Sequence, residues 1–271
     1  MTQSITASRP IRIAGAGHVL LAVTYSGLGV FGLIKGDFPP VWDSVPANVP
    51  ARLALVYLCA VLSLASGVGL LVPRAAALAA RVLFACLLLW MLLFRLPQVI
   101  LSPTFGVFWP AFVTAAVLAG AWTLYIHLAD DWDRLRLGFL TGDKGLRIAR
   151  AVYALALFFF GAAHFIDPHD TLTLEPAWLP WHVFWAYFFG CTFIAAGLAV
   201  LTNLFARVAA ALTTLQLALF TCLVWVPMIA AGSKDAFVWS ETILSAALTA
   251  NAWVVADSYR ALPWLAFPKR K

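Results

Sequence analysis

Histidines and carboxylates gather in one short stretch of this sequence. Between residues 164 and 182 lie three of the five histidines and three carboxylates, namely His164, Asp167, His169, Asp170, Glu175 and His182. Imidazole and carboxylate groups bind zinc, copper and iron, and imidazole exchanges protons near neutral pH. One interpretation is a divalent transition-metal site made by His164, His169, Asp170 and Glu175. The others are a proton or ligand site, or a solvated loop with interfacial histidines, because the spacing matches no strict ligand motif.

Aromatic residues flank this stretch on both sides. Phe158, Phe159 and Phe160 precede it, and Trp185, Tyr187, Phe188 and Phe189 follow it. An aromatic and mostly apolar cavity would suit a quinone or another flat, lipid-soluble ligand. The candidate ligand-binding residues are His164, Asp167, His169, Trp178, His182 and Tyr187. The alternative is an ordinary core with a lipid-facing aromatic belt.

The amino-acid composition indicates which class of structural elements positions these groups. The chain is 63% hydrophobic and 11% charged, far from the balance of soluble domains. A nucleic-acid partner is not expected despite the net charge of +6, because the basic residues lie at the ends of apolar runs and form no single face. The four cysteines lie inside apolar runs without a CxxC spacing, which favours small buried hydrophobes over redox thiols.

Eight apolar runs are each long enough to cross a bilayer, which takes about 20 residues of helix. They cover residues 13–34, 53–72, 75–94, 107–127, 148–165, 183–201, 206–229 and 236–255. We therefore predict an all-α integral membrane protein with eight transmembrane helices. The first run is interpreted as a retained helix and not as a signal peptide.

The basic residues predict the orientation of these helices. If the N-terminus is cytoplasmic, 14 of the lysines and arginines fall on the inner side and 4 on the outer side. This asymmetry predicts that both termini are cytoplasmic.

The two halves of the chain resemble each other at an offset of 130 residues. The matches include Pro46 with Pro176, Tyr57 with Tyr187, Gly67 with Gly197, Pro97 with Pro227 and Trp109 with Trp239. This predicts an internal duplication into two four-helix bundles, which are parallel repeats because each contains an even number of helices. The predicted units are 1–128, a cytoplasmic linker 129–147, and 148–271 with its basic tail.

Each predicted repeat has a proline-rich segment between its first two helices, expected to fold over the outer mouth of its bundle. Lys35 and Arg52 of the first repeat align with His164 and His182 of the second. Only the second repeat keeps titratable groups there, so a site is expected in the second bundle.

Other polar residues in the apolar runs are interpreted as structural. Gln216 is expected to bond across to the eighth helix, which carries Glu241 and Asn251. His18 and His127 are expected at the inner interface. Arg81 and Arg95 are expected to snorkel to the inner and outer faces.

Three segments of the second half resemble the DoxX-like superfamily of bacterial four-helix membrane proteins. They read FGAAHFIDP at 160–168, PAWLP at 176–180 and GLAVL at 197–201. The resemblance covers about 95 residues of the second half and less of the first; among its members are DoxD-type proteins, similar to a subunit of thiosulfate:quinone oxidoreductase. The chain departs from the pattern after Gly190 and Pro227, where Cys191 and Met228 replace the glutamate and asparagine of many relatives.

The resemblance implies a multi-pass protein of the bacterial inner membrane that anchors or assists a redox or maturation partner. It also implies a quinone or another small hydrophobic ligand, with His164 as the main polar residue carried over. No haem, flavin or iron–sulfur motif is present, so the chain is not expected to be a complete oxidoreductase. The alternatives are a membrane protein that binds or transports a metal ion or small solute through its outer His/Asp cluster, and a scaffold without a ligand.

Overall fold

The computed structural model describes residues 15–43, 45–46, 48–176 and 178–265, and these form helices without strands. Seven helices or helix stacks are long and apolar enough to cross a membrane, by length and composition. They are α1 (Ala16–Lys35), α2 (Arg52–Leu71), α3 to α4 (Ala76–Leu101), α5 (Phe105–Leu128), α8 (Asp143–Ile166), α10 (His182–Thr202) and α11 to α12 (Ala206–Ala230). The chain is therefore an all-helical protein suited to a lipid bilayer.

The eighth predicted run is also a helix, α13 (Ala236–Asp257), but its polar residues place it outside that group of seven. The first predicted run begins at residues outside the described part of the chain, and α1 begins at Ala16. The second and third runs are joined by a tight connection, as expected, because α2 ends at Leu71 and α3 starts at Ala76. The eighth span remains a prediction.

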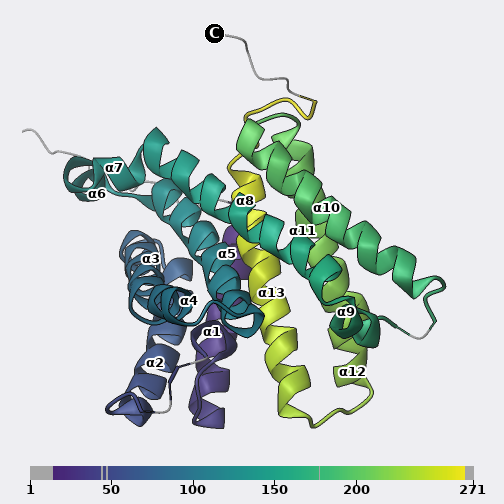
Figure 1. Cartoon of the computed structure of the whole chain (residues 1–271). Coiled ribbons are helices and arrows are strands. Elements are labelled where there is room, and N and C mark those ends of the chain that lie inside the picture. Colours follow the sequence, from purple (N-terminus) through teal and green to yellow (C-terminus); the bar gives the residue numbers. More distant parts are fainter. Residues whose placement is uncertain (1–14, 44, 47, 177, 266–271) are drawn as a thin grey trace, which may run out of the picture.

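Contacts between neighbouring helices close a ring. Going round it, the order is α1, α2, α3, α5, α8, α10, α11, α13 and again α1. α5 and α13 also contact each other across the ring, so two lobes share these two helices (Figure 1). α1 thus packs against the last helix of the chain, and α8 against the last long helix of the first half.

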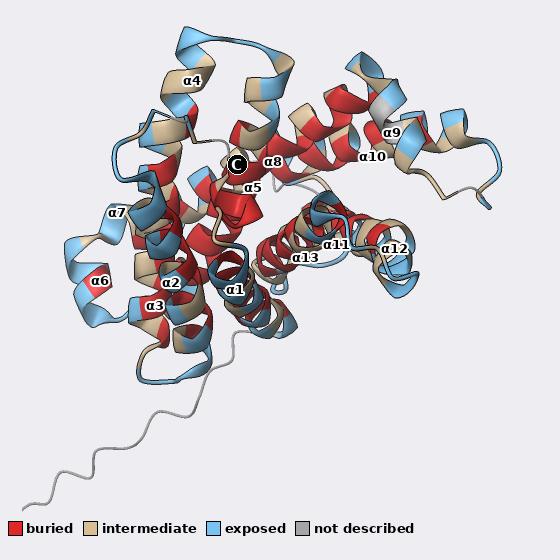
Figure 2. Cartoon of the chain, turned by 90° about the horizontal axis from the view of Figure 1, so that it is seen from below, coloured by how far each residue is buried: buried red, intermediate tan, exposed pale blue. Residues whose placement is uncertain are grey.

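Burial follows this arrangement. α5 is the most enclosed of the seven candidate spans, with 72% of its apolar window buried. Exposed residues occur along α2, α10 and the stacks α3 to α4 and α11 to α12 (Figure 2), and many of them are large and apolar. An outside that is apolar all round cannot face water over its whole area, which is why the bilayer is the fitting environment.

Several structural elements recur at the offset of 130 residues. α2 and α10 begin at Arg52 and His182, and α3 (Ala76–Trp90) and α11 (Ala206–Phe220) match end to end. A π-helical segment follows each of the latter, η2 (Met91–Arg95) and η3 (Thr221–Trp225), and leads into α4 (Leu96–Leu101) and α12 (Val226–Ala230). Pro97 and Pro227, near the start of these short helices, cannot donate an α-helical hydrogen bond, which accounts for the altered winding.

The segment between the halves is ordered against the bundle. α6 (Asp131–Arg136) and α7 (Gly138–Thr141) follow α5, and α8 starts at Asp143, earlier than the predicted boundary at 148. Asp130 accepts a hydrogen bond from the backbone N–H of Asp133, and Asp133 accepts one from that of Asp130, so a capping box starts α6. We call the side on which this segment lies the terminal face, because α1 begins and α13 ends there; the opposite side is the cap face.

Candidate functional site

His164 lies near the cap-face end of α8 and is buried, with 8% of the residue exposed. Its Nδ1–H donates to the carbonyl oxygen of Phe160 at 2.7 Å, and its ring lies 5.6 Å from that of Phe193. Among the described residues, Nε2 forms no hydrogen bond. In this neutral tautomer Nε2 is an acceptor, ready to receive a hydrogen bond from a hydroxyl group.

Glycines hold α8 close to α10 (His182–Thr202) and so fix the place of His164. A Cβ on Gly190 would lie 2.9 Å from the Cβ of His164 and 2.8 Å from the ring of Phe165. A Cβ on Gly161 would lie 2.7 Å from the carbonyl oxygen of Gly190. Small residues at both positions allow the backbones to approach, as is common between membrane helices.

The exposed side of this region is aromatic. Phe165 and Tyr187 stack at 5.4 Å, and each is about two-fifths exposed, 42% and 40%. Behind them Phe160 and Phe193 are buried and contact each other at 5.9 Å. His164 is thus a polar group set in an aromatic wall.

The remaining residues of the predicted cluster are spread out. Asp167 ends α8, His169 is exposed on α9 (Pro168–Leu174), and Trp178 is 67% exposed. Oε2 of Glu175 lies 4.0 Å from Nδ1 of His182, a contact that links the segment between α9 and α10 to α10. Burial raises the pKa of Glu175, and His182 offsets part of that rise.

The structure does not bring His164, His169 and Glu175 together. Within the described part of the chain, no three His, Cys, Asp or Glu side chains are arranged to hold a metal ion. The side chain of Asp170, the fourth predicted ligand, lies outside the described residues. The metal site therefore remains a prediction.

The corresponding segment of the first half is built quite differently. Its short 3₁₀ helix η1 (Pro40–Trp42) is buried and contacts α5 and α13. Trp42 donates from Nε1 to the hydroxyl of Ser63 at 2.8 Å and meets Trp90 edge-on at 5.2 Å. The first proline-rich segment is thus inserted into the helices, whereas the loop between α9 and α10 projects away from them (Figure 1).

The prediction that Arg95 snorkels to the outer face is wrong. Arg95 is 1% exposed and points inward from the end of η2, where the wider winding of the π segment turns it toward α5. Its Nε donates to Thr114 at 3.0 Å, and its Nη2 pairs with Asp43 at 3.3 Å. The inserted segment supplies the carboxylate that makes burial of this guanidinium tolerable.

Aromatic side chains fill the equivalent space in the second half. At the offset of 130, Ser63, Trp90 and Arg95 correspond to Phe193, Phe220 and Trp225. Phe193 and Phe220 lie 6.3 Å apart, and Trp225 is buried. In the second half these aromatic side chains therefore take the place of an inserted tryptophan, and the segment between α9 and α10 projects away from the helices.

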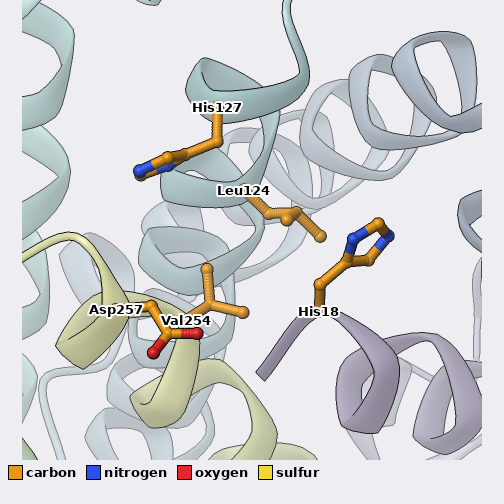
Figure 3. A pocket seen from close by; sticks show the side chains of 5 residues that line it. All are labelled: His18, Leu124, His127, Val254 and Asp257. Atoms are coloured by element: carbon orange, nitrogen blue, oxygen red, sulfur yellow. The ribbon is translucent and has the colours of Figure 1, made fainter. Parts of the chain in front are cut away.

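A small pocket opens at the terminal face between α1, α5 and α13. It is lined by His18, Leu124, His127, Val254 and Asp257 (Figure 3). His18 is buried and bonds through Nε2 to the carbonyl of Leu70 at 2.9 Å. Asp257 pairs with Arg260 at 2.8 Å. The sequence analysis treated both histidines as interfacial and did not predict that they line one pocket, although the offset of 130 relates Leu124 to Val254 and His127 to Asp257.

A second group of polar side chains on the terminal face holds the segment between α5 and α8 against the bundle. Arg81 of α3 contacts Asp133 at 2.6 Å and Asp130 at 3.1 Å, and its guanidinium lies 4.6 Å from the ring of Trp132. Tyr125 donates its hydroxyl to Asp133 at 2.7 Å. Burial alone would raise the pKa of Asp133, but the hydrogen bonds from Arg81, Tyr125 and the backbone outweigh it and hold that pKa below its usual range.

The predicted partner of Gln216 is also wrong. Gln216 accepts a hydrogen bond from Thr192 of α10 at 2.8 Å and does not reach across to α13. The contact with α13 comes from Thr221 in η3, which bonds Ser245 at 2.7 Å. Position 216 lies on the side of α11 that faces α10, which sequence periodicity alone did not reveal.

No protein-family model, no curated protein and no solved structure matches this chain.

Proposed function

We propose that the chain is an accessory membrane protein that binds a flat, lipid-soluble ligand of the quinone class beside His164. In this proposal α13 is the eighth span, the two halves are parallel repeats, and both termini are cytoplasmic. The protein would anchor or assist a redox or maturation partner in the bacterial inner membrane, as the resemblance to the DoxX-like superfamily implies.

The observation that carries the proposal is the unpaired Nε2 of a buried histidine within an aromatic wall. A polar atom in the apolar part of a membrane is costly unless it finds a partner. The Nδ1–H bond to Phe160 leaves Nε2 as an acceptor, which suits the hydroxyl of a quinol. Phe165 and Tyr187 offer a lipid-exposed stacking surface beside it.

The contrast between the halves supports the choice of site. In the first half the equivalent region holds Trp42, which is bonded to Ser63, and Arg95, which pairs with Asp43. In the second half the connecting segment stands off, and Trp178 and Trp181 are exposed. In the second half the imidazole of His164 therefore lies next to this exposed aromatic surface, which supports the choice of site.

The test is a titration of the purified protein in nanodiscs with a short-chain ubiquinol, followed by tryptophan fluorescence and native mass spectrometry. Replacing His164→Ala is expected to weaken binding about tenfold, which is the worth of one buried hydrogen bond. His169→Ala is the matched control, because this exposed histidine lies outside the aromatic wall. Equal affinities for wild type and His164→Ala would contradict the proposal.

The same preparation tests the alternative function. If elemental analysis finds one equivalent of a transition metal that is lost in His164→Ala, the protein handles a metal ion and not a quinone. Crosslinking in membranes would identify a partner protein. If anchoring of that partner does not depend on the ligand, His164→Ala should leave the yield of the crosslinked partner unchanged.

A further inference from the structure

The segment between α5 and α8 turns large apolar side chains outward. Trp132, Leu135 and Phe139 are 53%, 84% and 61% exposed. Its inner side includes Asp133 and Thr141, which are polar and buried. Short helices at a protein surface normally place their polar residues outside and their apolar residues inside. The outer side of this segment is therefore suited to an apolar surrounding and not to bulk water.

This segment is held firmly, so its outer side has a fixed direction. Besides the contacts of Asp133 described above, Trp122 of α5 donates from Nε1 to the carbonyl oxygen of Leu140 at 2.8 Å. At the other end, a Cβ on Gly145 would collide with that same carbonyl oxygen, so α7 packs directly on the first turn of α8. The exposed apolar side chains therefore cannot rotate inward.

The position of the segment says what surrounds it. α6 and α7 lie at the outer edge of the molecule, beyond α3 (Figure 1, Figure 2). They lie at the terminal face, where α5 ends and α8 begins. An edge at the level of the helix ends meets the boundary between lipid head groups and acyl chains, where aromatic and other apolar side chains of in-plane helices are favourable.

Cations without protein partners accompany the apolar side chains. Arg136, Lys144 and Arg147 are exposed and form no ion pair within the described part of the chain. Lys144 and Arg147 lie on one side of α8, and Ile148 and Leu155, exposed by 37% and 54%, continue that side further from the terminal face. The two cations thus stand where an apolar outer face ends, which is the level of lipid phosphates.

We propose that this surface binds the head group of an anionic phospholipid. We call it the rim patch, and it consists of Trp132, Leu135, Phe139, Arg136, Lys144 and Arg147. The cations would hold the phosphate oxygens, and the apolar side chains would contact the upper part of the acyl chains.

A lipid fits the rim patch better than an acidic protein segment does. The cations continue into the apolar outer face of α8, which only the bilayer can cover over its length. The exposed carboxylates nearby, Asp131 and Asp143, pair with none of the three cations and leave their charge available to a phosphate. The site is independent of the ligand proposed at His164, which lies toward the cap face.

Native mass spectrometry of the complete chain in detergent tests the proposal. The protein is titrated with phosphatidylglycerol and with phosphatidylcholine of the same acyl chains. Phosphatidylglycerol should bind about tenfold more tightly, because each cation at a membrane surface contributes a severalfold preference for anionic lipid. The combined variant Arg136→Gln, Lys144→Gln and Arg147→Gln should lose this preference.

The matched control removes the same charge from exposed positions outside the rim patch, through Lys35→Gln, Arg74→Gln and Lys234→Gln. This variant should keep the preference for phosphatidylglycerol. Equal losses in the two variants would overturn the proposal, because they would show that net charge alone attracts the lipid. Equal binding of both lipids by the wild type would overturn it in favour of an acidic protein segment. Displacement of the lipid by free glycerol phosphate would show an anion site that does not need a lipid.

A second measurement tests the apolar half of the rim patch. In a background without the native cysteines, Leu135→Cys is labelled with bimane and placed in nanodiscs that contain phosphatidylglycerol. The substitution replaces an exposed side chain, so the fold should be kept. Lipids brominated near the head group should quench the fluorescence, and iodide in the water should not. Quenching by iodide alone would overturn the proposal.

Discussion

Asp133 illustrates how a single carboxylate can hold a whole segment in place. Its side chain is completely buried and receives contacts from Arg81 on α3 and Tyr125 on α5. Removing one partner from a buried pair leaves the other charge uncompensated. The connection 129–142 should therefore depend on this one residue more than on any exposed charge nearby.

Asp133→Asn should lower the free energy of unfolding by about 3 kcal/mol at neutral pH. The measurement is thermal unfolding in detergent, followed by circular dichroism. Asp131→Asn is the control, since Asp131 is exposed on the same helix, and it should change stability by less than about 0.5 kcal/mol. Similar losses in both variants would mean that the ion pair does not hold α6.

The pH dependence of this effect has a defined sign. Because the pKa of Asp133 is depressed in the folded protein, its stabilisation is present above the unfolded pKa of about 4 and is lost as pH falls below that value. The melting temperatures of wild type and Asp133→Asn should therefore converge as the pH falls below 4. A difference that stays constant down to that range would show that Asp133 does not titrate with folding.

For single residues, the sequence predicted which polar side chains lie in the apolar runs better than it predicted the partners that they contact. His164 was singled out by the cluster of histidines and carboxylates, and the structure places its ring 5.6 Å from that of Phe193. The direction of Arg95 did not follow, because a π segment rotates it inward and a residue 52 positions earlier supplies its carboxylate. Such pairs depend on tertiary contacts that local spacing does not encode.

Among the elements, the two proline-rich segments differ most between the halves. The first inserts Trp42, which is 1% exposed, and the second leaves Trp178 at 67%. The prolines predicted that both segments fold over the outer mouth of their bundles, whereas the first segment is inserted among the helices and the second projects away from them. The two segments differ because the interiors that they contact differ. In the first half Ser63 accepts the indole N–H of Trp42, whereas in the second half Phe193, at the related position, fills the corresponding space.

Trp42→Ala should therefore destabilise the protein by about 4 kcal/mol, because it leaves a large cavity and an unpaired Ser63. Trp178→Ala should be nearly neutral. Chemical unfolding of the two variants in the same detergent compares them directly. If both lose the same stability, the two segments play equal structural roles and the contrast between the halves fails.

The close crossing of α1 and α2 offers a second test at the scale of elements. A Cβ on Gly29 would meet the backbone of Leu64 and Ala60 at 2.5 and 2.6 Å, whereas a Cβ on Gly27 would meet nothing within 4 Å. Gly29→Ala should separate the helices and cost about 2 kcal/mol. Gly27→Ala should be neutral or slightly stabilising, because alanine is the better helix former. Unfolding curves for the pair would detect the difference, and equal stability would contradict the crossing.

For the whole molecule, the ring of helix contacts leads us to expect that the two halves stabilise each other. α1 contacts α13, and α8 contacts α5, so each half of the chain packs against a helix of the other half. The composition and apolar runs predicted the helices, whereas the internal duplication indicated by the offset of 130 stays a prediction. The closure of the ring was not predictable, because any pair of apolar faces can meet in lipid and the sequence does not state which.

The contact between α5 and α13 should therefore control the stability of the complete protein. Gly120 lies at this contact, and a Cβ there would lie 2.7 Å from the Cα of Asn251, a backbone atom that cannot yield alone. Gly120→Ala should lower the free energy of unfolding by about 2 kcal/mol or more, because the whole of α13 must shift. Gly106→Ala, on the same helix but in open space, should leave stability unchanged. Unfolding monitored at once in both lobes, through tryptophans placed singly in each, should show that Gly120→Ala weakens them together; loss confined to one lobe would mean that the halves fold independently.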